Sequence, residues 1–510
     1  MQVGNARASK TEAGGSIMCY TGTTMARDIS RHTTRTVFAF VILVGLLSFA
    51  VTYNALFSVA FILLCMGVYV LSYHLELGFY VMIALSMMTG WQLNLADYYG
   101  IFRDYPALLS INAPVADFWV VFLLVAFSLQ YFRQWIAGKR QSIVTPGLLL
   151  YAFFLLSALV SLVNIPVVER GEGINYLFRF LVFLYVGYIV LGVNICRDKQ
   201  TLLNGLKILA GVGVFAAIMG IVSLPLGLWT VGGFTRAVPF GILGWSPFGN
   251  VHILIAEVLT TTLPIAVFFY VQSEKKNKTA WAISAALMLI TAVLTLSRAA
   301  ILTIGVEACL LAYLFRKKIK WERFVAQFSW VLGLLAIPMF YAAYFILTNP
   351  TVEASQDARS HLTGIAIYLF REHPFIGQGV GSFLARLAEV DLFRLEFGDP
   401  LEAHGVVQKI LAEQGLFGLV TFSVFVGYIF WRLYQRYQQE QYSIEARMLS
   451  LLGFFLVLSP AVFQLFNTQY YSSKMWIPIM LAMAQFTIYK TDKKHGKVFH
   501  SDRKPIVAEV

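Results

Sequence analysis

The run LNGLKILAGVGVFAAIMGIVSLPL, residues 203–226, decides the fold class of this protein. Its only charged residue is Lys207, near its beginning. A helix rises about 1.5 Å per residue, so about 20 apolar residues cross the hydrocarbon layer of a membrane. The run therefore predicts a transmembrane helix. Together with similar apolar runs it gives fourteen predicted spans, at 36–53, 55–73, 76–95, 114–132, 147–165, 175–194, 203–226, 252–272, 280–296, 299–315, 324–347, 406–431, 447–466 and 475–489.

The composition of the whole chain leads to the same fold class. Of 510 residues, 58% are hydrophobic and only 13% are charged, and the mean hydropathy is +0.70. Soluble proteins carry about 25% charged residues, because their surface must be hydrated. A soluble enzyme is therefore excluded, and we predict an all-α, polytopic membrane protein with about 12–14 transmembrane helices. The net charge of +12 is then explained by cytoplasmic loops and not by nucleic-acid binding.

Lysines and arginines set the predicted orientation. If the N-terminus is cytoplasmic, 28 of the 39 lysines and arginines fall on the cytoplasmic side, where positive charge accumulates in membrane proteins. The N-terminal tail has no apolar stretch ending in a cleavage site, so it is not predicted to be a signal peptide. We expect both termini in the cytoplasm and five parts, namely a tail (1–35), spans one to eleven (36–347), a large extracytoplasmic loop (348–405), spans twelve to fourteen (406–489) and a basic tail (490–510).

Two of the predicted outer segments are long. The first, at 227–251, is rich in glycine and proline, and the second is the large loop at 348–405. Apolar residues of 352–370 recur at helical spacing, which predicts an amphipathic helix on the membrane surface or over a cavity. The glycine-rich stretch 373–381 follows as a connector. Long loops in compact proteins are usually functional, so we expect the functional site here.

Five arginines lie at the predicted outer face, against the charge bias. The planar guanidinium group stays ionised and donates two parallel hydrogen bonds to a phosphate, so these arginines form a candidate anion site. They are Arg179, Arg236, Arg298, Arg359 and Arg371. The alternative is that each reaches lipid headgroups or pairs with an acidic loop residue, among them Glu353, Asp357, Glu372 and Glu402. Function is favoured for Arg179 and Arg298, because a charge beside apolar helix is costly.

His404 ends the large loop, directly before the twelfth predicted span. A histidine beside arginines is suited to take a proton from a hydroxyl group, and its alternative role is a helix cap. Glu413 either orients His404 indirectly or packs on a polar helix face. Glu257 is expected to pair with an arginine of the anion site, and Glu307 to be protonated or bonded to a neighbouring helix.

The sequence predicts neither a metal nor another cofactor. No carboxylate pair and no group of His, Cys and Asp has the spacing of metal ligands. The four cysteines are too far apart in the sequence for a zinc site and do not form a disulfide framework. The glycines at 377, 379 and 381 lack the Lys-Ser/Thr ending of a nucleotide-binding loop.

Five features follow one another between residues 280 and 430. They are LSR at 296–298, Arg359 in the amphipathic helix, HPFIGQG at 373–379, His404, and LAEQGLFG at 411–418. This layout resembles the O-antigen ligase and O-antigen polymerase superfamily of membrane glycosyltransferases.

The resemblance implies a metal-independent glycosyltransferase at the outer face of the bacterial inner membrane. Such enzymes move a glycan from an undecaprenyl-diphosphate carrier to a hydroxyl group of a glycan or lipid, in the synthesis of lipopolysaccharide and other surface polysaccharides. It implies that Arg298 and Arg359 bind the diphosphate and that His404 acts in a direct, inverting displacement. The family usually has Asn where this chain has Gly405, a difference that bears on the type of acceptor more than on donor binding. Further substrate contacts are expected from Arg179, Arg236, Arg371, Glu257 and Glu413.

Three alternatives to a ligase stay open. The acceptor is a second lipid-linked glycan in a polymerase and a protein in an O-oligosaccharyltransferase, and the sequence does not separate these. The competing class is a flippase of lipid-linked glycans. Transporters tend to have two related halves with broken or polar helices at the midplane, and neither is found in this sequence.

Overall fold

The computed structural model describes residues 55–94, 112–139, 141–167, 170–231, 234–243, 245–316, 333, 336–337, 339–345, 347–398 and 401–488. The predicted span 36–53, much of 324–347 and both predicted tails lie outside the described residues. The chain divides into two units, Met1–Val70 and Leu71–Val510. In the first unit the described residues belong to one apolar helix, α2 (Ala55–Leu71).

The second unit is helical, and the predicted all-α, polytopic membrane fold is confirmed. Eight of its described helical segments are long and apolar enough to cross a membrane. Seven of them are single helices, namely α6 (Val115–Ile136), α10 (Lys199–Ser223), α11 (His252–Gln272), α12 (Lys275–Leu294), α13 (Arg298–Phe315), α18 (Val406–Gln438) and α19 (Ile444–Gln464). The eighth is one continuous segment made of α8 (Arg170–Phe178), the π-helical η4 (Arg179–Val190) and α9 (Leu191–Ile195).

Shorter elements complete the described part of this unit. The apolar helices are α3 (Leu75–Ser86), α7 (Leu148–Ser161), which continues into the 3-10 turn η2 (Leu162–Asn164), and α20 (Ser473–Ile488). Two antiparallel hairpins join β1 (Gln92–Asn94) to β2 (Asn112–Pro114) and β3 (Thr230–Val231) to β4 (Phe234–Thr235).

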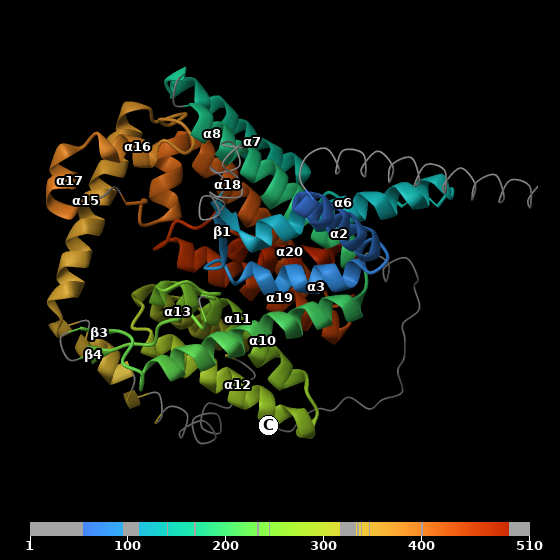
Figure 1. Cartoon of the computed structure of the whole chain (residues 1–510). Coiled ribbons are helices and arrows are strands. Elements are labelled where there is room, and N and C mark those ends of the chain that lie inside the picture. The colour runs from blue at the N-terminus through green and yellow to red at the C-terminus, as the bar shows by residue number, and fades with distance from the viewer. Residues whose placement is uncertain are drawn as a thin grey trace, which may run out of the picture. The chain divides into compact units, whose positions relative to one another are not determined.

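The large loop folds into three helices with a small apolar core of its own. These are α15 (Pro350–Glu372), α16 (Phe383–Ala388) and α17 (Asp391–Phe397), which lie together in Figure 1. Leu362, Ala366 and Leu369 of α15 are buried against residues of α16, α17 and α18. Part of the apolar face predicted for 352–370 is therefore covered by protein, whereas Ile367 and Tyr368 stay exposed, and α15 is held over the beginning of α18.

A kink in α18 is the second feature that positions the loop. Gly415 has a φ of 64°, outside the helical range, and this frees carbonyl groups of the preceding turn. The freed carbonyls of Ala412 and Glu413 accept hydrogen bonds of 2.8 Å from the N–H groups of Gln378 and Gly379. In return, Leu416 N–H donates to Pro374 O at 2.8 Å. The two glycine-containing motifs noted in the sequence thus bind each other through their backbones.

Candidate functional site

Five side chains from five parts of the chain form what we call the arginine–histidine site. Arg236 follows β4, His252 begins α11, Arg298 begins α13, Arg359 lies on α15 and His404 precedes α18. The Nη1 atom of Arg236 lies 3.3 Å from Nε2 of His252. Arg359 acts electrostatically on both histidines, and Arg298 acts on Arg359 and His404. Three of the five predicted arginines are therefore brought together with His404.

The start of α13 fixes the position of Arg298. Leu296 adopts a positive φ of 54°, and the hydroxyl of Ser297 caps the helix by accepting from Ala300 N–H. Arg298 then donates from Nη1 to Gln356 Oε1 at 2.9 Å. Since Gln356 lies one turn before Arg359 on α15, this bond joins the motif LSR to the helix of the large loop.

Arg236 is positioned by aromatic residues. Its guanidinium carbon lies 3.5 Å from the centre of the Trp229 ring. The neighbouring Thr235 is held through its backbone, since its N–H donates to the hydroxyl of Tyr341 at 2.8 Å and its carbonyl accepts from that hydroxyl at 2.9 Å. Burial lowers the pKa of Arg236 to about 10, so the group stays positively charged at neutral pH.

The arginines of the site have no acidic partner in the described part of the chain. None of its six ion pairs includes Arg236, Arg298 or Arg359. The Nε atoms of Arg236 and Arg359 are buried and have no hydrogen-bond partner among the described residues. The pKa of Arg359 is lowered, first because the group is buried and second because Arg298 is positively charged. Partly buried cations with vacant donors are suited to bind a polyvalent anion.

His404 is neutral in this surrounding. Burial is the first cause, and the cations of Arg359 and Arg298 add to it, so that the pKa of His404 is lowered to about 4. The unprotonated ring has a free electron pair with which it can accept a proton. His404 thus has the protonation state required of a general base.

Two predicted arginines lie apart from the arginine–histidine site. Arg179 forms an ion pair of 2.8 Å with the buried Asp117 of α6 and donates from Nε to Tyr471 O at 2.9 Å. Asp117 also accepts a hydrogen bond from Tyr188. Arg371 is exposed in the last turn of α15, and no hydrogen bond or ion pair joins it to the site within the described ranges.

The predicted acidic residues have partners other than arginine. Glu257 of α11 is buried, with its Oε2 3.8 Å from the Nζ of Lys474, and its Oε1 accepts from Gln464 at 2.6 Å. The expectation of an arginine partner is therefore not met in the described residues. Glu307 accepts a hydrogen bond from Ser459 of the neighbouring helix α19.

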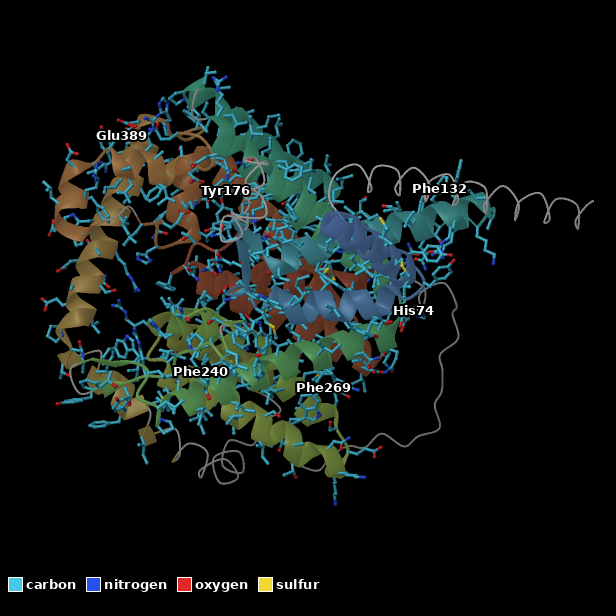
Figure 2. The ribbon with its side chains drawn as sticks, viewed as in Figure 1. His74, Phe132, Tyr176, Phe240, Phe269 and Glu389 are labelled. Carbon is cyan, nitrogen blue, oxygen red and sulfur yellow. The ribbon has the colours of Figure 1, made fainter. Side chains whose placement is uncertain are left out.

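Glu413 belongs to a network around a residue that sequence reasoning missed, Lys409. The buried Nζ of Lys409 lies 2.5 Å from Glu402 and 3.6 Å from Glu413, and it also donates to the hydroxyl of Tyr176 at 3.4 Å. Tyr176 lies on α8 (Figure 2). Glu413 accepts from Phe383 N–H at 3.3 Å and so reaches the start of α16. The sequence signal was a lysine inside a predicted span, four residues before a glutamate.

His252 is the other residue that sequence reasoning missed. It is the first residue of the span predicted at 252–272 and follows the long segment 227–251. That position at the predicted outer face, next to a loop with an arginine, was the available signal.

The arrangement does not provide a metal site. Among the described residues, no three His, Cys, Asp or Glu side chains lie together so as to bind a metal ion. The two histidines of the site are set among arginines, whose positive charge disfavours a cation.

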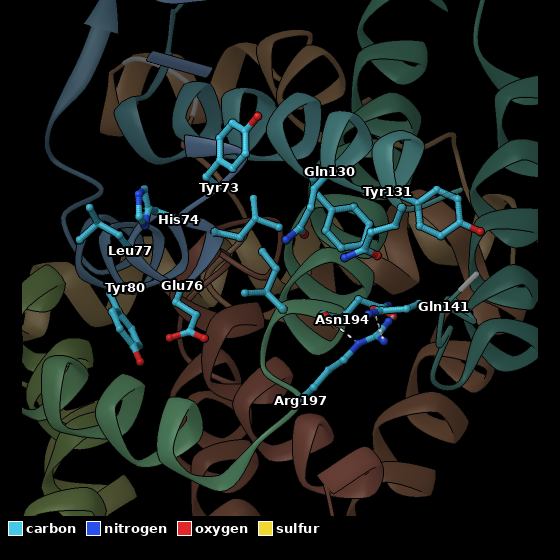
Figure 3. A pocket seen from close by; sticks show the side chains of 14 residues that line it. Tyr73, His74, Glu76, Leu77, Tyr80, Gln130, Tyr131, Gln141, Asn194 and Arg197 are labelled. Carbon is cyan, nitrogen blue, oxygen red and sulfur yellow. Dashed lines mark hydrogen bonds between the residues drawn. The ribbon is translucent and has the colours of Figure 1, made fainter. Parts of the chain in front are cut away.

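A cavity of about 570 Å³ in the described structure lies elsewhere. It is lined by the turn before α3 and the beginning of that helix, by the second half of α6, and by the end of α9 and the residues near it. Figure 3 shows Arg197 at its wall, where it donates to Asn194 and Gln141. No residue of the arginine–histidine site lines this cavity.

One family of known proteins matches part of the chain. Residues 283–423 match the model of the family described as O-antigen ligase. The resemblance drawn from the motifs is therefore confirmed for this region, which contains Arg298, Arg359 and His404. Arg236 and His252 lie outside it. No curated protein matches the chain.

Proposed function

We propose that this multi-pass membrane protein, which is similar to O-antigen ligases, moves a glycan from an undecaprenyl-diphosphate carrier to a hydroxyl acceptor. The reaction takes place at the outer face of the bacterial inner membrane and serves the synthesis of surface polysaccharide. The observation that carries the proposal is a set of three arginines without an acidic partner among the described residues, next to a neutral His404.

In the proposed reaction Arg236, Arg298 and Arg359 bind the diphosphate of the donor. His404 accepts the proton of the acceptor hydroxyl while the hydroxyl oxygen attacks the anomeric carbon. The bond from that carbon to the diphosphate oxygen breaks, and its electron pair stays on the diphosphate, so the configuration is inverted. The guanidinium groups stabilise the charge that develops on the leaving diphosphate in a partly dry site.

The donor also adjusts the strength of the base. In the donor-free protein the neighbouring arginines contribute to the low pKa of His404, about 4. The negative charge of a bound diphosphate offsets those cations, which raises the proton affinity of His404. Proton transfer from the acceptor is therefore favoured only when the donor is present.

Close packing explains why residue 405 is a glycine, and this packing lies beside His404, where we expect the acceptor. A Cβ atom at this position would lie 2.6 Å from the carbonyl oxygen of Leu465 and 1.9 Å from Oε1 of Gln408. The backbone that follows α19 thus approaches the residue after His404 too closely for a side chain. An asparagine here requires Leu465 to move, so this side of His404 differs from that of proteins with the family's usual residue.

The test is single-turnover transfer from purified undecaprenyl-diphosphate glycan, with the protein in nanodiscs. His404→Ala should bind the donor but transfer about 10²–10⁴-fold more slowly, the usual contribution of positioned proton transfer. Arg298→Lys should stay impaired, because lysine keeps the charge and loses the two-pronged geometry. Arg386→Lys is the matched control, since Arg386 lies in the same loop but pairs with Glu389 at 3.1 Å.

The acceptor panel distinguishes the related functions. Transfer to a lipid core glycan identifies a ligase, transfer to a second lipid-linked glycan a polymerase, and transfer to a protein hydroxyl an O-oligosaccharyltransferase. Wild-type protein that transfers to none of them, yet moves the donor between leaflets of a vesicle, is a flippase and contradicts the proposal.

A further inference from the structure

The contact between His252 and Arg236 determines which nitrogen of the histidine ring carries a proton. Nε2 of His252 lies 3.3 Å from Nη1 of Arg236. A guanidinium group has only N–H donors and no acceptor, so Nε2 must be the acceptor. The neutral ring then carries its proton on Nδ1. A doubly protonated ring would have no acceptor for Arg236 and would add a third positive charge beside Arg236 and Arg359, both of which act on it.

This assignment leaves a buried donor to be satisfied. Nδ1 of His252 is shielded from solvent and has no hydrogen-bond partner in the described ranges, and the same holds for Nε of Arg236 and Nε of Arg359. Buried N–H groups without an acceptor are destabilising and are rare in folded proteins. The three donors come from three different parts of the chain, and all belong to the arginine–histidine site, in which Arg236 and Arg359 both act on His252. An anion with several oxygen atoms offers the acceptors that such donors need.

The helix that carries His252 favours the same ligand. α11 is 21 residues long, begins at His252 and has no side-chain cap at its N-terminus. The first N–H groups of a helix lack partners within the helix, and its dipole is positive at this end. Phosphate groups bind readily at such positions.

We propose that His252 is a substrate-binding residue that donates its Nδ1–H to a phosphate oxygen of the lipid diphosphate, while Arg236 holds the ring through Nε2. This inference rests on the proposed function and adds an uncharged donor to its three arginines. A fourth cation in place of His252 would increase the repulsion within the site and oppose protonation of His404 still further. A neutral histidine binds the phosphate without either effect.

Two amide substitutions separate the two hydrogen bonds of the ring. In His252→Asn the amide group stands at the position of Nδ1, and in His252→Gln it stands at the position of Nε2. We expect the affinity of His252→Asn for undecaprenyl-diphosphate glycan to stay within about threefold of that of the wild type, because the N–H group that donates to phosphate is kept. His252→Gln keeps the partner of Arg236 and should bind about 10- to 100-fold more weakly, the effect of losing one hydrogen bond to a charged group.

The measurement is equilibrium binding of undecaprenyl-diphosphate glycan to the protein in nanodiscs, with inorganic pyrophosphate as competitor. His361→Gln is the control, because His361 is exposed on α15. If His252→Gln does not purify as a monodisperse protein, His252→Leu replaces it with the same expectation.

Equal binding by wild type and His252→Gln overturns the inference. The reverse order, with loss in His252→Asn and retention in His252→Gln, also overturns it, because that order means that the ring only holds Arg236. A wild-type protein that binds neither the donor nor pyrophosphate contradicts the proposed function itself.

Discussion

Arg179 and Arg359 show at the residue level that the neighbours of an arginine decide its role. Both were predicted to bind substrate from their position at the outer face. The charge of Arg179 is compensated by Asp117 at 2.8 Å, and its Nε donates to the carbonyl of Tyr471, so the protein itself provides partners for this arginine. Arg359 has a buried Nε with no partner among the described residues. The position of an arginine in the sequence predicts a charge at a membrane face, but not whether that charge is compensated.

The pH dependence of transfer tests the link between Arg359 and His404. Protonated His404 cannot act as a base, so kcat/KM of the wild type should fall as the pH drops through about 4, the pKa in the donor-free protein. Arg359→Gln removes a positive charge that opposes protonation, and the pKa of His404 should therefore rise toward its ordinary value. We expect the acidic limb of the profile to move to higher pH, whatever the loss in absolute rate.

Arg371→Gln is the control for this measurement. Arg371 lies on the same helix, but it is exposed and is not among the charges that act on His404. An acidic limb that stays in place in Arg359→Gln, or moves equally in Arg371→Gln, contradicts the electrostatic link.

At the level of elements, the kink of α18 explains why two separate glycine motifs occur in the loop region. A Cβ atom on Gly377 would lie 2.3 Å from the carbonyl carbon of Glu413, and one on Gly415 would lie 2.5 Å from that of Phe375. Both glycines also have positive φ, of 70° and 64°. The two backbones can approach only because neither position has a side chain. This contact holds the large loop on α18.

Gly415→Ala should therefore destabilise the protein by about 1–3 kcal/mol, through strain at positive φ and through the clash with Phe375. The measurement is the unfolding temperature in detergent, together with the transfer rate, which should fall as the loop loosens. Gly427→Ala is the matched control in the same helix, where a Cβ atom meets nothing within 4 Å. It should leave the unfolding temperature unchanged or raise it, since alanine is the better helix former. Equal stability of the two variants would show that the contact does not hold the loop.

At the scale of the whole molecule, the sequence predicts most of the described helices because length and apolarity are local properties, although the span predicted at 76–95 is helical only to Ser86 and then leads into β1. α11 begins and ends at the residues predicted for a span, 252–272. The partner of a buried charge is often far away in the sequence, so the spacing of residues did not predict these pairs. Glu257 and Lys474 lie 217 positions apart, and only the packed helices bring their side chains to 3.8 Å. The family-like motifs predicted that Arg298, Arg359 and His404 act together, but the sequence did not show that Arg179 and Arg371 lie apart from them or that His252 joins them.

Substitution of Lys409 tests how much such buried ion pairs contribute to the unfolding free energy. Lys409→Met leaves Glu402 and Glu413 without their cation and should cost about 3–5 kcal/mol of unfolding free energy. Lys199 is the control, because its ion pair with Glu445 has the same length, 2.5 Å, but both side chains are nearly half exposed. Lys199→Met should cost less than about 1 kcal/mol.

The second arm of this experiment removes the charge that Lys409→Met leaves behind. Adding Glu413→Gln should restore part of the lost stability, because one uncompensated carboxylate disappears. Unfolding is followed at equilibrium in mixed detergent micelles. If Lys409→Met and Lys199→Met lose a similar amount of unfolding free energy, burial does not increase the contribution of the Lys409 network to stability.

The site residues and the basic segments occupy opposite ends of the described helices, and this predicts the orientation of the whole molecule. His252, Arg298 and His404 stand at or just before the beginnings of α11, α13 and α18, whereas Lys275 and Lys276 stand where α11 has ended and α12 begins. Positive charge outside the site should mark the cytoplasm, so the arginine–histidine site should face outward, the side on which we propose that the reaction takes place. We expect a cysteine at Glu389, which is exposed in the large loop, to react with a membrane-impermeant maleimide in cells with a permeabilised outer membrane. A cysteine at Lys276 should react only after the inner membrane is opened.

Both variants are made in a chain whose native cysteines are replaced, and detergent-solubilised protein gives the full labelling of each. Labelling of Lys276→Cys but not Glu389→Cys in intact inner membranes would reverse the orientation and place the arginine–histidine site in the cytoplasm, and labelling of both would contradict the separation of the two ends by a membrane.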